Sequence, residues 1–361
     1  MNTVLILGSG GLAADIVIDI NAQPHCGWEV VGIVDDVPAL TVPLAQCPLL
    51  GPLGQLADIV DREQPDCVVV ALTERRGRTP VSTLVESCIA RGIHVEEASE
   101  FYEHLTGMLA LESLAPTSIV FSKQFRRSRA YERTARWLSL LVAVIGLVAL
   151  WPLMALIALA IKLDSPGPVL FVHERVGARG RSFNLLKFRT MRVCSSHRSE
   201  WEGDNTDRVT RLGRWLRKCR FDELPQFINI LRGEMNLVGP RPHPVSNLAL
   251  FSLVARNLNE LSGTAVGFYA LRTMVRPGIT GWAQTRYGYA NNLDEEIEKL
   301  RYDLYYVKYA SMLLDLRILF DTVAVMAHGY SLRDASTSAH SARPSALPSL
   351  LRTISMTKQP S

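Results

Sequence analysis

The sequence predicts an α/β protein in three parts: an amino-terminal parallel-sheet domain, a re-entrant membrane helix, and a mainly helical domain held at the membrane. Three observations predict this organisation. Short apolar segments alternate with helical ones over residues 1–120, an uncharged apolar run covers Trp137–Ile161, and a basic segment follows. Alternating strands and helices with continuously apolar strands are typical of a doubly wound parallel sheet.

The amino-terminal domain is expected over residues 1–120, with a glycine-rich turn after its first strand. Gly8, Gly10 and Ala13 fit the G-x-G-x-x-A form of the dinucleotide fingerprint, and Asp35 lies where a ribose hydroxyl would be bound. These residues make the domain Rossmann-like, with a nucleotide or a coenzyme A-like molecule as the expected class of ligand. The same residues would equally serve a tight turn and close helix–strand packing. Strands are expected at residues 3–9, 29–34, 67–72 and 93–96, with a helix after the glycine turn that runs through Ile20 and another at residues 81–91.

This half of the chain is not expected to be the seat of catalysis. It contains no Tyr-x-x-x-Lys pair or comparable site for hydride transfer. We therefore expect a sensor or docking domain, whether or not it holds a nucleotide.

Charge divides the chain sharply. Residues 1–120 hold 5 Arg, no Lys and 16 Asp+Glu, a balance of −11, whereas residues 121–361 hold 34 Lys+Arg and 19 Asp+Glu, a balance of +15. A basic half beside a membrane segment should face anionic lipid headgroups and phosphorylated ligands. We expect no nucleic-acid partner, since no recognised nucleic-acid module is present. The six scattered cysteines indicate reduced thiols rather than a disulfide framework.

The apolar run predicts a membrane helix at residues 137–163, after a basic linker at residues 121–136. It is long enough to cross a bilayer. Both flanks are basic, however, and positive charge marks the cytoplasmic side. Pro152, near the middle, should bend the helix. We therefore expect it to enter from the cytoplasm, bend at Pro152 and return. The alternatives are an ordinary spanning helix and, less in keeping with its length, a buried soluble helix.

Two adjacent carboxylates, Asp222 and Glu223, lie in the string FDELPQFINILRG (Phe221–Gly233). We expect Asp222 at the N-cap of a helix that stops at Gly233, and capping alone would explain it. A carboxylate in the positive potential of a helix N-terminus stays ionised, and can bind a divalent metal or attack phosphorus.

The surrounding cations point to phosphate. Prolines on both sides of Arg241 stiffen the backbone that presents its guanidinium, which suits bidentate phosphate binding. Lys187 and Arg189 are expected on one face of a strand at residues 183–191. An acidic pair, a metal and several cations beside a bilayer predict phosphoryl transfer.

From about Trp137 to Tyr330 the chain resembles the bacterial sugar transferases, the monotopic polyprenyl-phosphate phosphoglycosyl transferases. The resemblance covers more than half of the chain, with several long motifs in the same order. The motifs are SPGPVLF, ERVG, LLKFRTM, FDELPQFINILRGEMNLVGPRP, RPGITGWAQ (Arg276–Gln284) and YDLYYVKYASMLLDL (Tyr302–Leu316).

The resemblance implies transfer of a sugar 1-phosphate from a nucleotide diphosphate sugar, expected to be a UDP-sugar, to undecaprenyl phosphate. This would be the first membrane step of exopolysaccharide or O-antigen synthesis, at the inner (cytoplasmic) membrane with both soluble domains on its cytoplasmic face. It implies a catalytic domain at residues 164–330, in which Asp222 is the nucleophile and carries the phosphosugar. Glu223 would be the second catalytic carboxylate, and Asp222 and Glu223 would hold Mg²⁺. The expected phosphate-binding residues are Lys187, Arg189, Arg217, Arg241 and Arg276.

The chain departs from the family's pattern in two places. Many larger members begin with a four-helix membrane bundle, where this chain has the Rossmann-like domain. The membrane kink has Trp151-Pro152 in place of the frequent Ser-Pro, which removes any hydrogen bond from a serine side chain.

Other readings of the chain stay open. The alternative functions are a membrane-anchored nucleotide-sugar oxidoreductase and a non-enzymatic scaffold for polysaccharide assembly. Residues 315–328 suit either the membrane surface or a core. Residues 331–361 are expected to form a disordered tail. The transferred sugar and the oligomeric state, including a homo-oligomer, are open.

Overall fold

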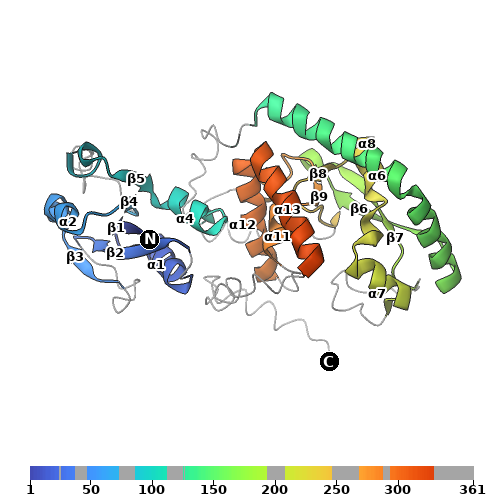
Figure 1. Cartoon of the computed structure of the whole chain (residues 1–361), viewed down its shortest axis with the longest axis horizontal. Coiled ribbons are helices and arrows are strands. Elements are labelled where there is room, and N and C mark those ends of the chain that lie inside the picture. The colour runs from blue at the N-terminus through green and yellow to red at the C-terminus, as the bar shows by residue number, and fades with distance from the viewer. Residues whose placement is uncertain are drawn as a thin grey trace.

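The computed structural model describes residues 1–23, 26–36, 47–72, 86–111, 125, 127–192, 208–245, 268–287 and 293–328. Within these residues the chain forms two folded parts with one long helix along the second, as Figure 1 shows. The predicted tail at residues 331–361 and the first half of the helix predicted at residues 81–91 lie outside the described residues.

The amino-terminal part is a five-stranded parallel sheet in the order β3-β2-β1-β4-β5, the order of doubly wound dinucleotide-binding sheets. The predicted parallel sheet is confirmed, and four of its strands lie within two residues of their expected bounds. The strands are β1 (Asn2–Leu7), β2 (Trp28–Val34), β3 (Leu49–Gly51), β4 (Cys67–Val70) and β5 (His94–Glu97).

Helices cover both faces of this sheet, because its strands are apolar on both faces. Val4 and Ile6 of β1 pack with helices α1 (Gly11–Ala22) and α4 (Ala98–Thr106), while Leu5 and Leu7 pack with α2 (Leu56–Glu63) on the other face. Between β4 and β5, the described part of the expected helix ends in a 3-10 turn, η2 (Ile89–Arg91), with Gly92 in the left-handed conformation at φ 76°.

The apolar run lies in one continuous helix, α6 (Arg129–Asp164), of 36 residues. It begins eight residues before Trp137, because Ser128 caps it by accepting a hydrogen bond from the Ala130 amide. Most of the described part of the expected linker is therefore helical. The helix continues through Pro152. It is long and apolar enough to cross a membrane, and only 11% of its most apolar 18-residue segment is buried.

α6 packs along the carboxy-terminal part over most of its length, and Figure 1 shows it arching over that part. Near its start, Arg136 donates to the main-chain oxygens of Ile230 and Met235 at 2.6 and 2.8 Å. Near its end, Ile157 and Ile161 enter a cluster with Phe188 and Leu216. Its other face is exposed and apolar, and carries Trp137, Leu141, Ile145, Val148, Trp151, Leu156 and Leu159.

The carboxy-terminal part combines helices with two small sheets. The hairpin β6 (Leu170–Val176) and β7 (Ser182–Phe188) is antiparallel, and β8 (Asn236–Val238) pairs with β9 (Gly278–Thr280) in parallel. The helices are α7 (Arg211–Lys218), α8 (Gln226–Arg232), α10 (Phe268–Arg272), α11 (Trp282–Arg286), α12 (Leu293–Tyr309) and α13 (Met312–His328).

The amino-terminal domain docks on α12 and α11, beside which Figure 1 places α4. Glu103 of α4 is fully buried, and its Oε2 accepts from Lys308 Nζ at 2.6 Å and from the Tyr309 hydroxyl at 2.7 Å. Trp282 Nε1 donates to the main-chain oxygen of Gly107 at 2.8 Å. The two parts are therefore joined by a buried ion pair and specific hydrogen bonds.

Candidate active site

The two carboxylates lie in a 3-10 turn, η7 (Phe221–Glu223), and both are buried, with 8% of Asp222 and 7% of Glu223 exposed. Arg220, in the left-handed conformation at φ 55°, turns the chain into this segment. The prediction that Asp222 caps the next helix is wrong. Pro225 stands at the N-cap of α8, which starts at Gln226 without a side-chain cap and ends at Gly233 as expected.

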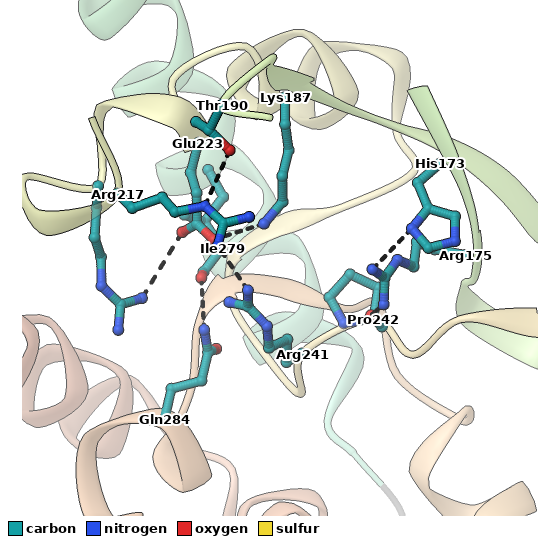
Figure 2. Close-up of polar contacts among 11 residues, drawn as sticks. His173, Arg175, Lys187, Thr190, Arg217, Glu223, Arg241, Pro242, Ile279 and Gln284 are labelled. Carbon is teal, nitrogen blue, oxygen red and sulfur yellow. Dashed lines mark hydrogen bonds and ion pairs between the residues drawn. The ribbon is translucent and has the colours of Figure 1, made fainter. Parts of the chain in front are cut away.

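Three cations surround Glu223. Lys187 Nζ lies 3.0 Å and Arg241 Nη2 3.2 Å from Oε1, while Arg220 Nη1 lies 3.8 Å from Oε2. Figure 2 shows the side chains of Lys187 and Arg241 converging on Glu223 from separate elements. Burial alone would raise the pKa of Glu223, but Lys187 and Arg241 outweigh it and hold that pKa far below its ordinary value. Glu223 is therefore an ionised, neutralised carboxylate.

Asp222 differs from its neighbour. Among the described residues no hydrogen bond or ion pair holds its carboxylate, and its pKa is raised, first by burial and then by the charge of Glu223. Lys187, Arg241 and Arg217 oppose that rise. Burial also lowers the pKa of Lys187, although Glu223 offsets part of this. Glu223 is thus held in ion pairs, whereas Asp222 is available for chemistry. Both carboxylates lie in the positive electrostatic potential of the surrounding cations.

Hydrogen bonds fix the positions of the cationic residues around Asp222 and Glu223. Lys187 comes from β7, and Arg217 of α7 donates from Nε to the Thr190 hydroxyl at 3.0 Å, as Figure 2 shows. Arg241 lies in a turn that is bonded to β9: the Gly239 amide donates to Thr280 O at 2.9 Å, and the Gly278 amide to Pro240 O at 3.0 Å. A side chain at Gly278 would collide with the backbone of Gly239, so only glycine permits this approach.

A hollow of about 230 Å³, open to solvent, adjoins these residues. Its lining includes Lys187 and Arg241, together with Arg175, Leu185, Gln226, Pro242 and Gly278. Arg175, Lys187 and Arg241 give this wall three cationic side chains, and Gln226 adds a polar one. The hollow therefore suits a phosphorylated ligand.

Asp222 and Glu223 fit a magnesium ion. They are adjacent buried carboxylates whose mutual repulsion contributes to the raised pKa of Asp222, and a divalent cation would relieve it. Mg²⁺ is usually bound by one or two carboxylates, with substrate phosphates and waters completing its shell. Within the described part of the chain no three His, Cys, Asp or Glu side chains form a metal cluster, so substrate oxygens would have to complete the shell.

Two of the expected phosphate-binding residues lie elsewhere. Arg189 is buried and donates to the main-chain oxygens of Ser165 and Pro166 at 2.6 and 3.0 Å, where it fastens the exit from α6. Arg276 donates from Nε to Gly233 O at 3.2 Å. Neither has a recorded contact with Asp222 or Glu223, and a phosphate role for either stays a prediction.

The glycine turn of the amino-terminal domain is satisfied internally. Asp35 Oδ2 accepts from the Ser9 amide and hydroxyl at 2.8 and 2.5 Å. Gly8 has φ 103°, and a Cβ there would lie 2.9 Å from Ala71 O. Gly10 stands at the N-cap of α1 and Ala13 is fully buried in the core. These contacts account for all four residues as packing, and nucleotide binding stays a prediction.

Sequence reasoning missed Arg220, Thr190 and Arg175 as parts of this site. Arg220 stands two residues before Asp222, but its left-handed backbone, which brings it back to Glu223, has no sequence signal in an arginine. Gln226 was also missed. It lies four residues after Asp222 in the same string, a spacing that could have suggested it.

Comparison with known proteins supports the motifs. A family model described as bacterial sugar transferase matches residues 130–329. The chain is 37% identical to the UDP-N-acetylgalactosamine-undecaprenyl-phosphate N-acetylgalactosaminephosphotransferase of Aeromonas hydrophila over 68% of this chain and 55% of that protein. It is 34% identical to the undecaprenyl-phosphate glucose phosphotransferase of Komagataeibacter xylinus over 89% of this chain and 58% of that protein.

A third relative matches about half of the chain. The UDP-glucose:undecaprenyl-phosphate glucose-1-phosphate transferase of Escherichia coli K12 is 39% identical over 51% of this chain and 38% of that protein. The chain thus spans less than two thirds of the length of each of these three relatives. The family match covers more than half of this chain and includes α6, the carboxylate pair and the Arg241 turn. The chain therefore belongs to the bacterial sugar transferase family.

Proposed function

We propose that this protein transfers a sugar 1-phosphate from a UDP-sugar to undecaprenyl phosphate through a phosphosugar carried on Asp222. The observation that carries the proposal is the inequality of the two carboxylates. Lys187 and Arg241 neutralise Glu223, whereas Asp222, buried beside it, is available to react. Family membership and the names of the relatives, which are undecaprenyl-phosphate sugar phosphotransferases, support the same reaction class.

The chemistry proceeds in two displacements. An oxygen of the Asp222 carboxylate attacks the sugar-bearing phosphorus, and the bond from that phosphorus to the bridging oxygen breaks. UMP leaves with the electron pair of that bond, and an acyl phosphosugar remains on Asp222. A phosphate oxygen of undecaprenyl phosphate then attacks the same phosphorus and releases the Asp222 carboxylate. The product is undecaprenyl diphosphate sugar.

The arrangement of charge suits the first displacement. A carboxylate that approaches a diphosphate is repelled unless the charge on the phosphate oxygens is neutralised. Arg241 and Lys187 line the hollow, and Arg217 acts on Asp222 from the other side. These preorganised cations would hold the phosphate oxygens and stabilise the charge that develops in the transition state. Mg²⁺ bound by Asp222, Glu223 and the diphosphate would supply further charge neutralisation.

We infer a re-entrant position for α6 from its packing. Its beginning contacts Ile230 and Met235 and its end contacts Phe188 and Leu216, and all four belong to the same folded part. A helix that left this part to cross the bilayer would abandon one of these contacts. The docking of Glu103 on Lys308 joins both soluble parts. We therefore propose that both soluble parts lie on one face of the membrane, and the basic flanks favour the cytoplasmic face of the inner membrane.

The relatives guide the choice of donor and pathway. Two of the relatives above are named for UDP-glucose or UDP-N-acetylgalactosamine, and a Rhizobium leguminosarum relative, 39% identical over 49% of this chain, is called an exopolysaccharide production protein. We therefore place the reaction at the start of exopolysaccharide or O-antigen synthesis, with a UDP-hexose or its N-acetylated form as donor.

The proposal is tested with membranes or purified enzyme that hold no acceptor. Wild-type protein given a UDP-sugar radiolabelled in the sugar, with Mg²⁺, should release UMP and keep the label covalently. Asp222→Asn keeps the size of the side chain but removes its charge, so label should not be trapped and turnover with acceptor should fall by about 10⁴-fold or more. If Asp222→Asn still traps label, Asp222 is not the nucleophile, and Glu223 becomes the candidate.

A further inference from the structure

The backbone that presents Arg241 is fastened by two side chains as well as by β9. The Gly278 amide binds Pro240 O at 3.0 Å, and the Val176 amide binds His243 O at 2.9 Å. Between these two main-chain contacts, Arg241 O accepts from Arg272 Nη2, and Pro242 O accepts from Arg175 Nη1 at 3.3 Å. The carbonyl of Arg241 itself therefore depends on the guanidinium of Arg272.

Arg272 is in turn fixed by α12. Its Nε lies 2.7 Å from Asp303 Oδ2, and only 4% of either side chain is exposed. The guanidinium thus donates from Nε to Asp303 and from Nη2 to Arg241 O. Only a planar fork of several donors can serve both acceptors in fixed directions, because a lysine ammonium is a compact charge on a flexible stem.

A buried ion pair is weak evidence for stability. Well-packed apolar residues of similar volume often replace such a pair at no cost to the fold. The pair is buried, which costs desolvation free energy, and Arg272 also donates a hydrogen bond to one particular carbonyl. A purely structural role would require neither feature. That carbonyl belongs to the residue that reaches Glu223 at 3.2 Å with its own guanidinium.

We propose that Arg272, oriented by Asp303, is a positioning residue that sets the place of Arg241 in the site. The inference rests on the proposed function, in which Arg241 holds phosphate oxygens of the donor. Arg272 touches no substrate. It acts by fixing the main chain of Arg241, so that the guanidinium meets Glu223 and the donor phosphates without a search over backbone conformations.

The first test replaces the pair by apolar residues, Arg272→Met with Asp303→Leu. The fold should keep its melting temperature within a few degrees, because both members of the buried ion pair are removed together. The rate of UMP release under kcat/KM conditions should fall by about 10- to 100-fold, since a misplacement of about 1 Å costs up to about 100-fold. If the double variant melts far lower, Arg272→Lys, which keeps a cation opposite Asp303, replaces it and should show the same loss of rate. A folded variant with wild-type kcat/KM overturns the proposal.

The second test asks whether the effect passes through Arg241. In a background that carries Arg241→Lys, the Arg272→Met and Asp303→Leu changes should cause no further loss, because the guanidinium that they position is gone. Losses that multiply in the two backgrounds would show an independent role and refute the inference.

A matched control separates positioning from general damage to α12. Lys308→Met with Glu103→Leu removes another buried pair that involves α12 but has no recorded contact with Arg241, and should leave kcat/KM within about twofold. A comparable loss in this control would likewise overturn the proposal. Failure of the proposed function is distinguishable, because wild-type protein would then release no UMP, or Arg241→Lys alone would leave the rate unchanged.

Discussion

Replacing Ile161 by alanine tests whether the membrane helix is part of the core of the catalytic domain. Ile161 is 2% exposed near the end of α6 and packs with Phe188 and Leu216. Leu159, two residues earlier on the same helix, is 57% exposed. Leu159→Ala is therefore a control of similar chemistry at nearly the same depth in the membrane.

The magnitude follows from where each side chain goes when the domain unfolds. A buried isoleucine truncated to alanine costs about 2–5 kcal/mol, part of it transfer from water and part of it the cavity. Because α6 would stay in the bilayer, Ile161 passes from lipid rather than from water, and the cavity and lost packing remain. We expect about 2–3 kcal/mol for Ile161→Ala and within about 0.5 kcal/mol for Leu159→Ala.

Thermal unfolding in lipid nanodiscs measures the difference. For a domain of roughly 200 residues, 1 kcal/mol shifts the melting temperature by about 2–4 °C. Ile161→Ala should thus melt about 4–12 °C lower than wild type, and Leu159→Ala within about 2 °C of it. Equal shifts in the two variants would show that the catalytic domain does not use α6 as core, and the packing argument for a re-entrant helix would fall with it.

Two further predictions concern pH and topology. Burial and Glu223 raise the pKa of Asp222, so the ionised form of this proposed nucleophile is lost at higher pH than for an ordinary aspartate. Glu223→Gln removes the like charge and releases Lys187 and Arg241 from it, so the acid limb of UMP release should move to lower pH while the maximum rate falls. An acid limb that stays in place or moves upward would contradict this electrostatic picture. Single cysteines at Arg129 and at Arg179, both exposed and on opposite sides of the apolar run, should resist an impermeant maleimide in intact cells and react after permeabilisation. Labelling of either position from outside would exclude the re-entrant arrangement.

Much of the fold could be predicted from local pattern. Mainly apolar segments predicted β1, β2 and β4 within two residues of their bounds, and β5, whose residues are mixed, was predicted equally closely. Gly233 marked the end of α8 because its φ of 86° suits glycine. The strand β3, Leu49–Gly51, escaped prediction because three residues show no periodicity.

The site was predictable in its chemistry but not in its geometry. Asp222, Glu223, Lys187 and Arg241 were found by residue type, and the structure brings them together. The expected strand position of Arg189 is wrong, although its phosphate role stays a prediction. Alternation placed it on the same strand face as Lys187, yet the strand ends at Phe188 and its guanidinium turns to Ser165. The two-residue alternation of side chains predicts which face a residue lies on only for residues within the strand. Docking of the two soluble parts involves residues about 200 positions apart, and local pattern carries no information on such contacts.

The docked amino-terminal domain makes α12 a shared element of two neighbourhoods. Towards its carboxyl end Lys308 and Tyr309 hold Glu103, and one to two turns earlier Asp303 holds Arg272 behind the Arg241 turn. Trp282 forms a second such link: it donates a hydrogen bond to Gly107 of the amino-terminal domain, and it lies two residues after β9, whose Gly278 lines the hollow. If a molecule bound to the amino-terminal domain displaced α12 as a whole, rather than only breaking its contact with Glu103, it would also displace Asp303 and with it Arg272. By linkage, a donor bound at the hollow would shift the affinity for that molecule by the same factor.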